Sequence, residues 1–393
     1  MKILLTTDWY TPAVNGVVTS VLALRRQLLA HGHDVRVLTL AGGLRGWQAD
    51  GVWAVGSVDA GAIYPGARLR TPDAAAAVRA LAAWGPDVVH SQCEFSTFPL
   101  AKRIARACGA PLLHTYHTVY EDYTHYFSPS RRWGRAAVRA FTRHIAAGCD
   151  AFIAPTAKVA RLLESYGVAC PVHTLPTGID TARFARVDPA AAAALRARWG
   201  VQPGQAVLLY VGRLAQEKNI GELLALAQRL GAQGAAAKLV LVGDGPQRAR
   251  LQAQAGPQVV FAGMAAPSFV PVCYAAGDIF LSASTSETQG LTYLEALAAG
   301  RPAVCRADPC LQDVIVDGVN GWQYRTPEEL ERHVRTLLAD EPARRAMGRC
   351  AAATAARFSE QAFALQAAAL YRRAIIQKQA ARAAGKGLAV WSA

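Results

Sequence analysis

Short, continuously apolar segments alternate along the chain with longer alanine-rich stretches, and this alternation limits the possible folds most strongly. The segments are KILLTTD, DVRVLTL, DVVHSQC, APLLHTY, DAFIAP and VHTLP in the first half, then AVLLYVG, KLVLVG, VVFAG, DIFLSA and PAVC. Apolar strands separated by helices predict parallel sheets that are covered by helices on both faces. There are too many strands for one open sheet of usual size. We therefore expect an α/β chain with two doubly wound, Rossmann-like domains facing across a cleft.

The domain boundary is predicted near residues 177–193, where the polar turn TGIDTARFARVDPAAAA opens into a new helix. We assign residues 1–180 to an N-terminal domain and 181–359 to a C-terminal domain. Residues 360–393 are expected to form a C-terminal helix that packs back on the N-terminal domain. A chain of 393 residues is long enough for two domains with their own cores.

The net charge of +14 predicts anionic partners: nucleic acid, an anionic membrane or phosphorylated ligands. An arginine-rich proteome is the alternative source of part of this excess. The apolar runs are too short for a membrane span or a signal peptide. The eight cysteines show neither a CxxC pair nor zinc-ligand spacing, so reduced thiols in the cytosol are expected.

Ligands of doubly wound domains bind beyond the carboxyl ends of the strands, so the loops after the strands are the place to look for chemistry. Gly16, in AVNGVVTS, follows the first strand and opens a helix, where backbone N–H groups attract negative charge. The alternative is an ordinary turn glycine, which is the usual role of a glycine after a strand. Neither this loop nor VGDGPQR contains GxGxxG, which argues against a nicotinamide dinucleotide.

Two further loops carry candidate residues. Arg213 and Lys218, in YVGRLAQEKNI, could neutralise a diphosphate as a leaving group, or could be two solvated cations. No Asp-x-Asp is present to hold a metal for that purpose, so no metal is expected. His117 follows a strand in a loop that is predicted to face the cleft, although a structural histidine is the alternative. Its neighbours are Tyr116, Tyr120, Glu121, Asp122 and Tyr123.

Two glutamates lie in SASTSETQGLTYLEALAAGRP. We predict a helix over 291–299 that is ended by Gly300 and Pro302, with Glu287 in the preceding loop and Glu295 on the helix. Eight helical residues would rise roughly 12 Å, which exceeds the separation of about 5–10 Å that glycosidase carboxylates use. The spacing fits two separate contacts on one extended ligand, or two solvated surface acids.

The segment RRWGRAAVRAFTRHI, residues 131–145, has the pattern of a basic amphipathic helix. Four arginines fall within about 80° of one another at helical pitch, with an apolar group on the opposite side, and no acid occurs from His125 to Cys149. The segment is either a surface helix with its apolar side on the core or a contact with anionic lipid headgroups. Nucleic acid is disfavoured because the aromatic residues do not interleave with the arginines. The residues are Arg132, Arg135, Arg139 and Arg143, then Ala137, Phe141 and Ile145, with Trp133 and Phe127 near the helix start.

Together these motifs resemble the GT-B fold glycosyltransferases of retaining family 4 over nearly the whole chain. The matching motifs are NGV after the first strand, HT at 117–118, PTGID at 176–180, GRLAQEKN at 212–219, GDGP at 243–246 and E-x7-E at Glu287 and Glu295. The resemblance implies that Glu287 contacts the donor sugar and Glu295 lies near the nucleotide ribose. It also implies that the helix start receives the diphosphate and that His117 lies beside the transferred sugar. The catalytic set is His117, Glu287, Arg213 and Lys218, and the donor-binding set is Gly16, Arg213, Lys218, Glu287, Gln289, Gly290, Leu291 and Glu295, with no metal or other cofactor.

A narrower resemblance is to the bacterial 1,2-diacylglycerol 3-alpha-glucosyltransferases, through VVHSQCEFS, HTYHTVYEDYTHYF and SETQGLTYLEALAAG. It implies transfer of glucose from UDP-glucose to the 3-hydroxyl of diacylglycerol by a peripheral enzyme on the inner face of the cell membrane. The basic segment would bind the membrane, and no nucleic acid partner is expected. RADPCLQDVI (306–315) departs from the more glycine-rich loop expected. The alternatives are a phosphoinositide or soluble sugar acceptor, a UDP-sugar epimerase or hydrolase, and a non-catalytic basic binder.

Overall fold

The computed structural model describes residues 1–13, 15–61, 67–121 and 130–384. These residues form two compact units. Unit 1 comprises Met1–Gly178 and the C-terminal residues from Glu360 onward, and unit 2 comprises Ile179–Ser359.

Unit 1 is built on an eight-stranded sheet with the order β10-β9-β8-β7-β1-β2-β4-β3. The edge strand β3 pairs antiparallel with β4, and the other neighbours pair parallel. The chain moves outward from β1 in both directions, which is the doubly wound arrangement. A separate antiparallel pair is formed by β5 (Ser57–Asp59) and β6 (Arg68–Arg70). The sheet strands are β1 (Lys2–Thr6), β2 (Asp34–Leu40), β3 (Trp47–Ala49), β4 (Val52–Val55), β7 (Val88–Ser91), β8 (Leu112–Thr115), β9 (Ala151–Ala154) and β10 (Val172–Thr174).

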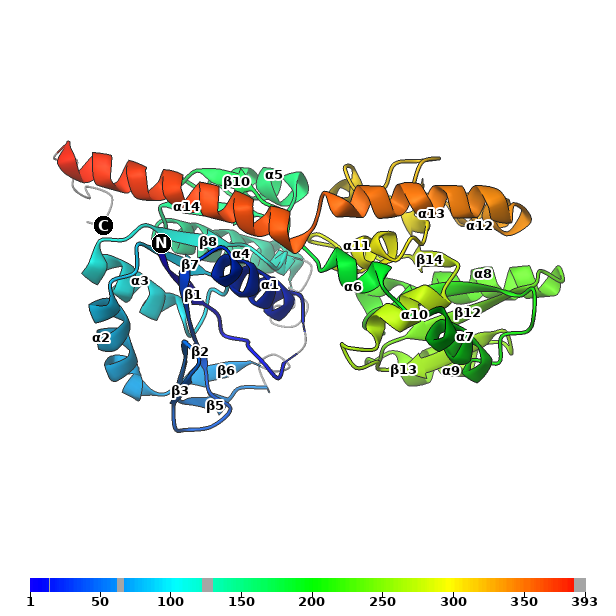
Figure 1. Cartoon of the computed structure of the whole chain (residues 1–393), viewed down its shortest axis with the longest axis horizontal. Helices are drawn as coiled ribbons and strands as arrows, with labels where there is room; N and C mark the ends of the chain where they lie inside the picture. The colour runs from blue at the N-terminus through cyan, green and yellow to red at the C-terminus, as the bar shows by residue number, and fades with distance from the viewer. Residues whose placement is uncertain (14, 62–66, 122–129, 385–393) are drawn as a thin grey trace. The chain divides into compact units, whose positions relative to one another are not determined.

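Helices cover both faces of this sheet because its strands are apolar on both sides. Leu4 of β1 belongs to the core under α2, α3, α4 and α5, whereas Ile3 and Leu5 belong to the core under α1 and α14. The C-terminal helix α14 lies alongside α1 (Figure 1). The helices are α1 (Gly16–Ala30), α2 (Ala75–Trp84), α3 (Phe98–Cys108), α4 (Arg131–Ala146), α5 (Ala157–Ser165) and α14 (Glu360–Ala383).

Unit 2 is built on a six-stranded parallel sheet with the order β13-β12-β11-β14-β15-β16. One apolar core lies under α6, α7, α10, α11 and α13, and a second lies under α8, α9 and α12. The strands are β11 (Ala206–Val211), β12 (Ala237–Val242), β13 (Val259–Gly263), β14 (Ile279–Ser282), β15 (Ala303–Arg306) and β16 (Gly321–Tyr324). The helices are α6 (Thr181–Ala185), α7 (Pro189–Arg198), α8 (Ile220–Ala232), α9 (Arg248–Gln254), α10 (Val270–Ala276), α11 (Leu291–Ala298), α12 (Pro327–Ala339) and α13 (Glu341–Ala356).

The strands expected from the sequence all occur, and the structure adds β3 to β6 and β16. The residues of β3 are all exposed, so this edge strand carries no apolar signal. In β16 the strand begins at Gly321, where a Cβ would lie 2.1 Å from the carbonyl oxygen of Ala303. This close approach between strands explains a glycine that otherwise argues against a strand. Within the described ranges, no helix is long and apolar enough to cross a lipid bilayer.

Candidate active site

In unit 2, the loops after β11 and β14 meet because these strands are neighbours in the sheet. Lys218 ends a short 3₁₀ turn after β11, and Glu287 lies in the loop between β14 and α11. The Lys218 ammonium donates to Glu287 Oε1 at 2.7 Å and to Ser284 Oγ at 3.4 Å. The two charged side chains are only 19% and 14% exposed. The interpretation of Glu287 and Lys218 as solvated surface charges is therefore wrong.

Glu295 differs from Glu287 in its hydrogen-bond partner and in its pKa. It lies on α11, is half-buried, and accepts a 2.8 Å hydrogen bond from the hydroxyl of Tyr274, a buried residue of α10. Burial raises the pKa of the Glu295 carboxyl to about 7, although the Tyr274 hydrogen bond and the positive charge of Arg183 both act in the opposite direction. Glu287 is thus paired with an ammonium group, whereas Glu295 is paired with a phenol. The Glu295 carboxyl also binds its proton more tightly than an ordinary glutamate does.

The helix that carries Glu295 begins with a constrained backbone. Gly290 has φ +74°, and a Cβ there would lie 2.5 Å from the ring of Tyr293. Gln289 and Gly290 are buried, and Leu291 is the first helical residue. The first turn of α11 contains no acidic residue. Its N-terminal N–H groups can therefore attract an anion, as expected for this segment.

The loop after β11 is packed against the loop after β12. A Cβ on Gly243 would lie 1.9 Å from the carbonyl oxygen of Gly212. Arg213 comes next and has an exposed side chain, while its carbonyl oxygen accepts a 2.9 Å hydrogen bond from the Tyr210 hydroxyl. The glycines of VGR and GDGP therefore let two loop backbones pass in contact and present Arg213 at the surface.

The segment that departs from the expected glycine-rich loop forms its own local structure. Arg306 pairs with Glu222 and lies 5.4 Å from the ring centroid of Tyr324. Asp308 caps a short 3₁₀ turn by accepting from the Cys310 N–H at 2.8 Å. Side-chain capping thus replaces the glycine-based turn expected here.

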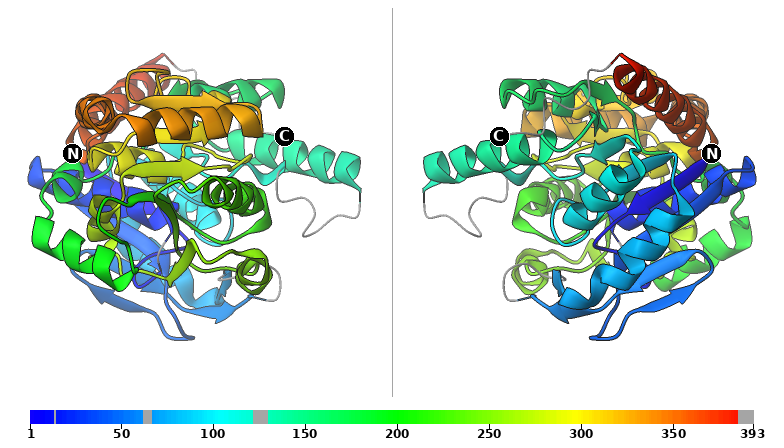
Figure 2. Two further views of the ribbon diagram at one scale, coloured as in Figure 1. Left: turned by 90° about the vertical axis from the view of Figure 1, so that its right-hand side faces the viewer. Right: turned by 90° about the vertical axis from the view of Figure 1, so that its left-hand side faces the viewer.

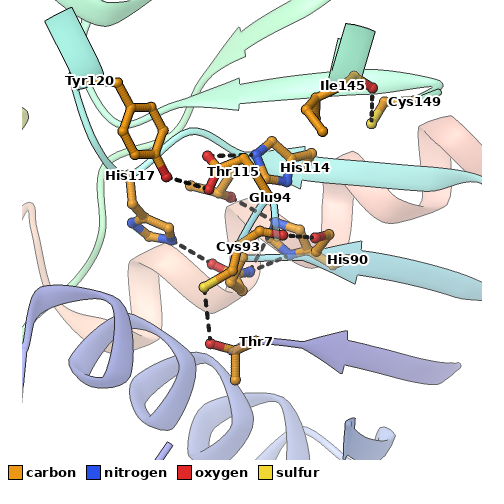
Figure 3. A network of polar contacts seen from close by, with 12 residues as sticks. Thr7, His90, Cys93, Glu94, His114, Thr115, His117, Tyr120, Ile145 and Cys149 are labelled. Atoms are coloured by element: carbon orange, nitrogen blue, oxygen red, sulfur yellow. Dashed lines mark hydrogen bonds and ion pairs between the residues drawn. The ribbon is translucent and has the colours of Figure 1, made fainter. Parts of the chain in front are cut away.

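In unit 1, a network of polar side chains follows β7 and β8, which are neighbours in the sheet (Figure 3). His117 is half-buried, and its Nε2 lies 2.7 Å from Gln92 Oε1. The Gln92 amide nitrogen lies 3.0 and 3.1 Å from the two ring nitrogens of His90. His90 in turn contacts the Tyr371 hydroxyl at 2.6 Å and the Thr115 hydroxyl at 2.7 Å. We call these five residues the histidine network.

The histidine network is neutral at physiological pH. Burial lowers the pKa of His117 to about 4, with Glu94 acting against this effect and His114 adding to it. Burial also holds the pKa of His90 well below its usual range. A neutral His117 that faces the Gln92 carbonyl oxygen carries its proton on Nε2 and donates it there. The Nδ1 atom of His117 is then left as an acceptor.

A second network supports the loop after β8. Glu94 is buried, lies 3.1 Å from His114 Nε2, and accepts a 2.7 Å hydrogen bond from the Tyr120 hydroxyl. Gln92 and Glu94 were not predicted as site residues, although both lie in the polar loop HSQCEFS. Of the expected neighbours of His117, Asp122 and Tyr123 lie outside the described residues.

Gly16 lies at the start of α1, where Asn15 accepts a 2.9 Å hydrogen bond from the Val18 N–H. It therefore belongs to unit 1, whereas the other residues expected to bind a nucleotide sugar belong to unit 2.

The predicted basic helix is α4, which projects from unit 1 (Figure 2). All four arginines have exposed side chains. Arg135 and Arg139 lie 3.5 and 3.7 Å from the carboxylate of Glu121, which precedes the helix by several residues. Arg132 and Arg143 lie on either side of this paired set along the helix.

The apolar side of α4 was only partly predicted. Val138, Thr142 and Ile145 are buried and Phe141 is half-buried, but Ala137 is exposed. The expectation for Ala137 is wrong because the helix turns Val138 toward the core, which leaves its neighbour on the solvent side. Trp133 is 78% exposed, and Phe127 lies outside the described residues.

Comparisons with known proteins agree with this architecture. The family model described as Glycosyltransferase Family 4 matches residues 14–183, and the model described as Glycosyl transferases group 1 matches residues 192–354. The chain therefore belongs to the GT-B fold glycosyltransferases of family 4, and it is a hexosyltransferase.

Two similar proteins share one name, and a solved structure shares the fold. The chain is 35% identical over 353 residues to the alpha-monoglucosyldiacylglycerol synthase of Streptococcus pneumoniae, covering 87% of this chain and 79% of the relative. It is 31% identical over 348 residues to the enzyme of the same name from Acholeplasma laidlawii, covering 85% and 87%. The crystal structure of Anabaena Alr3699/HepE in complex with UDP shares the fold, with a TM-score of 0.74, 19% identity, and coverage of 95% of this chain and 100% of that one.

Proposed function

We propose that this enzyme transfers glucose from UDP-glucose to the 3-hydroxyl of diacylglycerol at the membrane surface, with retention of the anomeric configuration and without a metal. The observation that carries the proposal is the half-buried Lys218–Glu287 pair, whose glutamate lies in the loop that leads into α11. The relationship to two alpha-monoglucosyldiacylglycerol synthases supports the choice of substrates.

The unit 2 residues suit a donor that carries both a diphosphate and a sugar. Lys218, the exposed Arg213 and the N–H groups of Gln289 to Leu291 would stabilise the negative charge of the leaving nucleotide diphosphate. Glu287 accepts a 2.7 Å hydrogen bond from Lys218, which holds its carboxylate in place, and its oxygens could also accept hydrogen bonds from sugar hydroxyls. Glu295 would contact the nucleotide ribose.

His117 would orient the transferred sugar rather than act as an acid. Its pKa of about 4 leaves the imidazole uncharged at neutral pH, and its Nδ1 can accept from a sugar hydroxyl. The acceptor hydroxyl would attack on the face from which the diphosphate leaves, which gives retention. The proton of the acceptor hydroxyl would pass to the leaving diphosphate oxygen.

The exposed side of α4 suits an anionic lipid surface. Its four exposed arginines and Trp133 combine positive charge with an aromatic residue that can enter the headgroup region. The net charge of +14 acts in the same direction. We infer a peripheral enzyme on the inner face of the cell membrane.

The test mixes the purified enzyme with radiolabelled UDP-glucose and diacylglycerol in micelles, with and without phosphatidylglycerol and with and without EDTA. Labelled lipid that increases with phosphatidylglycerol and is unaffected by EDTA is expected. Parallel arms replace the donor with GDP-mannose, or the acceptor with a phosphoinositide or a soluble sugar. Release of UDP or formation of a new UDP-sugar at full rate without acceptor would instead indicate a hydrolase or epimerase.

The membrane role of α4 is tested separately. Replacement of Arg132, Arg135, Arg139 and Arg143 by Glu is expected to abolish binding to phosphatidylglycerol vesicles at low salt. The charge-matched control reverses four exposed arginines of unit 2. Unchanged vesicle binding by the α4 variant would remove the membrane role from this helix.

A further inference from the structure

Tyr371 belongs to the C-terminal helix α14, yet its hydroxyl takes part in the polar contacts that follow β7 and β8. The hydroxyl lies 2.6 Å from Nδ1 of His90, and both side chains are buried. The two rings also meet in an edge-to-face arrangement, with their centroids 5.5 Å apart. On the other side of His90, the Thr115 hydroxyl lies 2.7 Å from Nε2 (Figure 3). The two hydroxyls thus hold both ring nitrogens of His90 and fix the plane of its ring.

The Gln92 amide lies over the face of this fixed ring. Its nitrogen is 3.1 Å from Nδ1 and 3.0 Å from Nε2 of His90. An atom so close to both nitrogens cannot lie in the ring plane, because the Cε1 atom between them would collide with it. The face of a neutral aromatic ring is electron-rich, so it attracts an N–H group and repels a carbonyl oxygen. The amide is therefore oriented with its NH₂ group toward His90 and its oxygen toward His117.

This orientation determines which nitrogen of His117 carries the proton. The Gln92 oxygen lies 2.7 Å from His117 Nε2 and can only accept, so Nε2 donates. If the amide were turned over, its NH₂ group would face Nε2, and the proton would have to lie on Nδ1. The turned amide would suit a charged His90, but burial holds the pKa of His90 well below its usual range. A hydroxyl can donate or accept, so Tyr371 and Thr115 together satisfy the N–H and the lone pair of a neutral ring.

We propose that Tyr371 is a positioning residue that sets the tautomer of His117. It acts through two side chains, since it fixes the ring of His90 and this ring orients Gln92. Loss of the Tyr371 hydroxyl would leave the buried Nδ1 of His90 without its partner, which is unfavourable. The Gln92 amide, 3.1 Å away, would replace that partner by moving into the ring plane, which would take its oxygen away from His117.

The C-terminal helix thus contributes to the site of unit 1 without facing the substrate. The tautomer leaves Nδ1 of His117 as the acceptor for a sugar hydroxyl, so the consequence for catalysis rests on the proposed function. The coupling of Tyr371 to the tautomer does not, and it can be measured without any substrate.

The test uses the full chain labelled with ring-¹⁵N histidine, because the ¹⁵N spectrum separates the Nε2–H from the Nδ1–H tautomer at neutral pH. The His117→Gln protein identifies the His117 signals by their absence. Tyr371→Phe removes only the hydroxyl that contacts His90. Tyr10→Phe is the matched control, because Tyr10 lies in the same apolar core and its hydroxyl accepts a 3.1 Å hydrogen bond from Arg25, outside the histidine network.

In the Tyr371→Phe protein, the ratio of the Nε2–H to the Nδ1–H form of His117 is expected to fall about fivefold, as for the loss of one buried hydrogen bond. Gln92→Leu removes the acceptor itself and should lower the ratio at least as far, whereas Tyr10→Phe should leave it unchanged. A wild-type ratio in Tyr371→Phe, or an equal fall in Tyr10→Phe, would overturn the proposal.

Thr115→Val provides a second variant should Tyr371→Phe not fold. It removes the hydroxyl at the other ring nitrogen of His90, so Nε2 would lose its partner and the Gln92 amide would be drawn into the ring plane in the same way. The His117 ratio should fall here too, and a wild-type ratio in this protein would overturn the proposal.

Glucose transfer by the same proteins separates this inference from the proposed function. The kcat of Tyr371→Phe is expected to fall about 3–10-fold, with the KM for diacylglycerol unchanged and with wild-type kinetics for Tyr10→Phe. A changed tautomer with wild-type kcat would support the coupling of Tyr371 to His117 and would count against the sugar-orienting role of His117.

Discussion

The candidate site residues of unit 2 include a charged pair, whereas those of the histidine network in unit 1 are neutral. In unit 2, Lys218 and Glu287 form a charged pair in a half-buried setting. In unit 1, the histidine network connects His117 to Tyr371 through neutral groups alone. A diphosphate leaving group needs fixed charge, whereas the orientation of a sugar needs hydrogen bonds of defined direction. Under the proposed function, charge stabilisation would be concentrated in unit 2 and the positioning of the sugar in unit 1.

The largest expected effect comes from breaking the charged pair. Lys218→Ala and Glu287→Ala are each expected to lower kcat/KM for UDP-glucose by about 10²–10³-fold, the loss typical of a group that stabilises transition-state charge. The matched controls are Glu341→Ala and Arg345→Ala, which break an exposed ion pair of α13. Wild-type turnover by a folded Lys218 or Glu287 variant would contradict the assignment.

A smaller loss of turnover is expected when a hydrogen bond of the histidine network is removed. Gln92→Leu removes the acceptor that holds His117 and should lower kcat by about 5–30-fold, as for the loss of one buried hydrogen bond. Gln92→Glu should raise the pKa of His117 toward neutrality and add a titration to the pH profile of kcat/KM. The control is Gln379→Leu, at an exposed position of α14. A Gln92→Glu profile identical to that of the wild type would show that Gln92 does not act through His117.

Glu295 should make unit 2 less stable at alkaline pH. Its folded pKa of about 7 lies above its ordinary value of 4.5, so the folded state binds the proton more tightly and stability is lost as pH rises from 4.5 to 7. Glu295→Gln should therefore gain up to about 3 kcal/mol relative to the wild type between pH 5 and pH 8. Urea unfolding at both pH values measures this difference, and an unchanged difference would mean that Glu295 has an ordinary pKa.

The contribution of His117 to the free energy of unfolding should change with pH in the opposite direction to that of Glu295, and by a smaller amount. Its folded pKa of about 4 lies below its ordinary value of 6.5, so its contribution to stability is present above pH 6.5 and is lost as pH falls toward 4. Relative to His117→Gln, the wild type should lose about 2 kcal/mol of unfolding free energy between pH 7.5 and pH 5. Parallel pH profiles for the two proteins would contradict an imidazole that is neutral at physiological pH.

The two-domain α/β architecture could be predicted from the sequence, and so could the loops that hold the charged candidate residues. Continuous apolar runs predicted the buried strands, and Gly300, with φ +68°, ends the helix after Glu295 close to the predicted position. The roles of Glu287, Lys218, Arg213 and His117 in catalysis stay predictions.

The partners of these residues could not be predicted, because they depend on strand order and on distant parts of the chain. Gln92 reaches His117 only because β7 lies beside β8, and Tyr371 reaches His90 across 281 residues of sequence. Glu121 precedes α4, yet nothing in the helical pattern showed that it pairs with Arg135 and Arg139. Local patterns specify elements, whereas these contacts arise from the packing of elements.

The most direct test of the central claim is to isolate the lipid product formed from UDP-glucose and diacylglycerol and to determine its linkage by proton NMR. We expect a single α-linked glucose on the 3-hydroxyl from the wild type, and at least about a hundredfold less of the same product from Lys218→Ala. A β-linked product, or equal product from the Lys218→Ala enzyme, would contradict it.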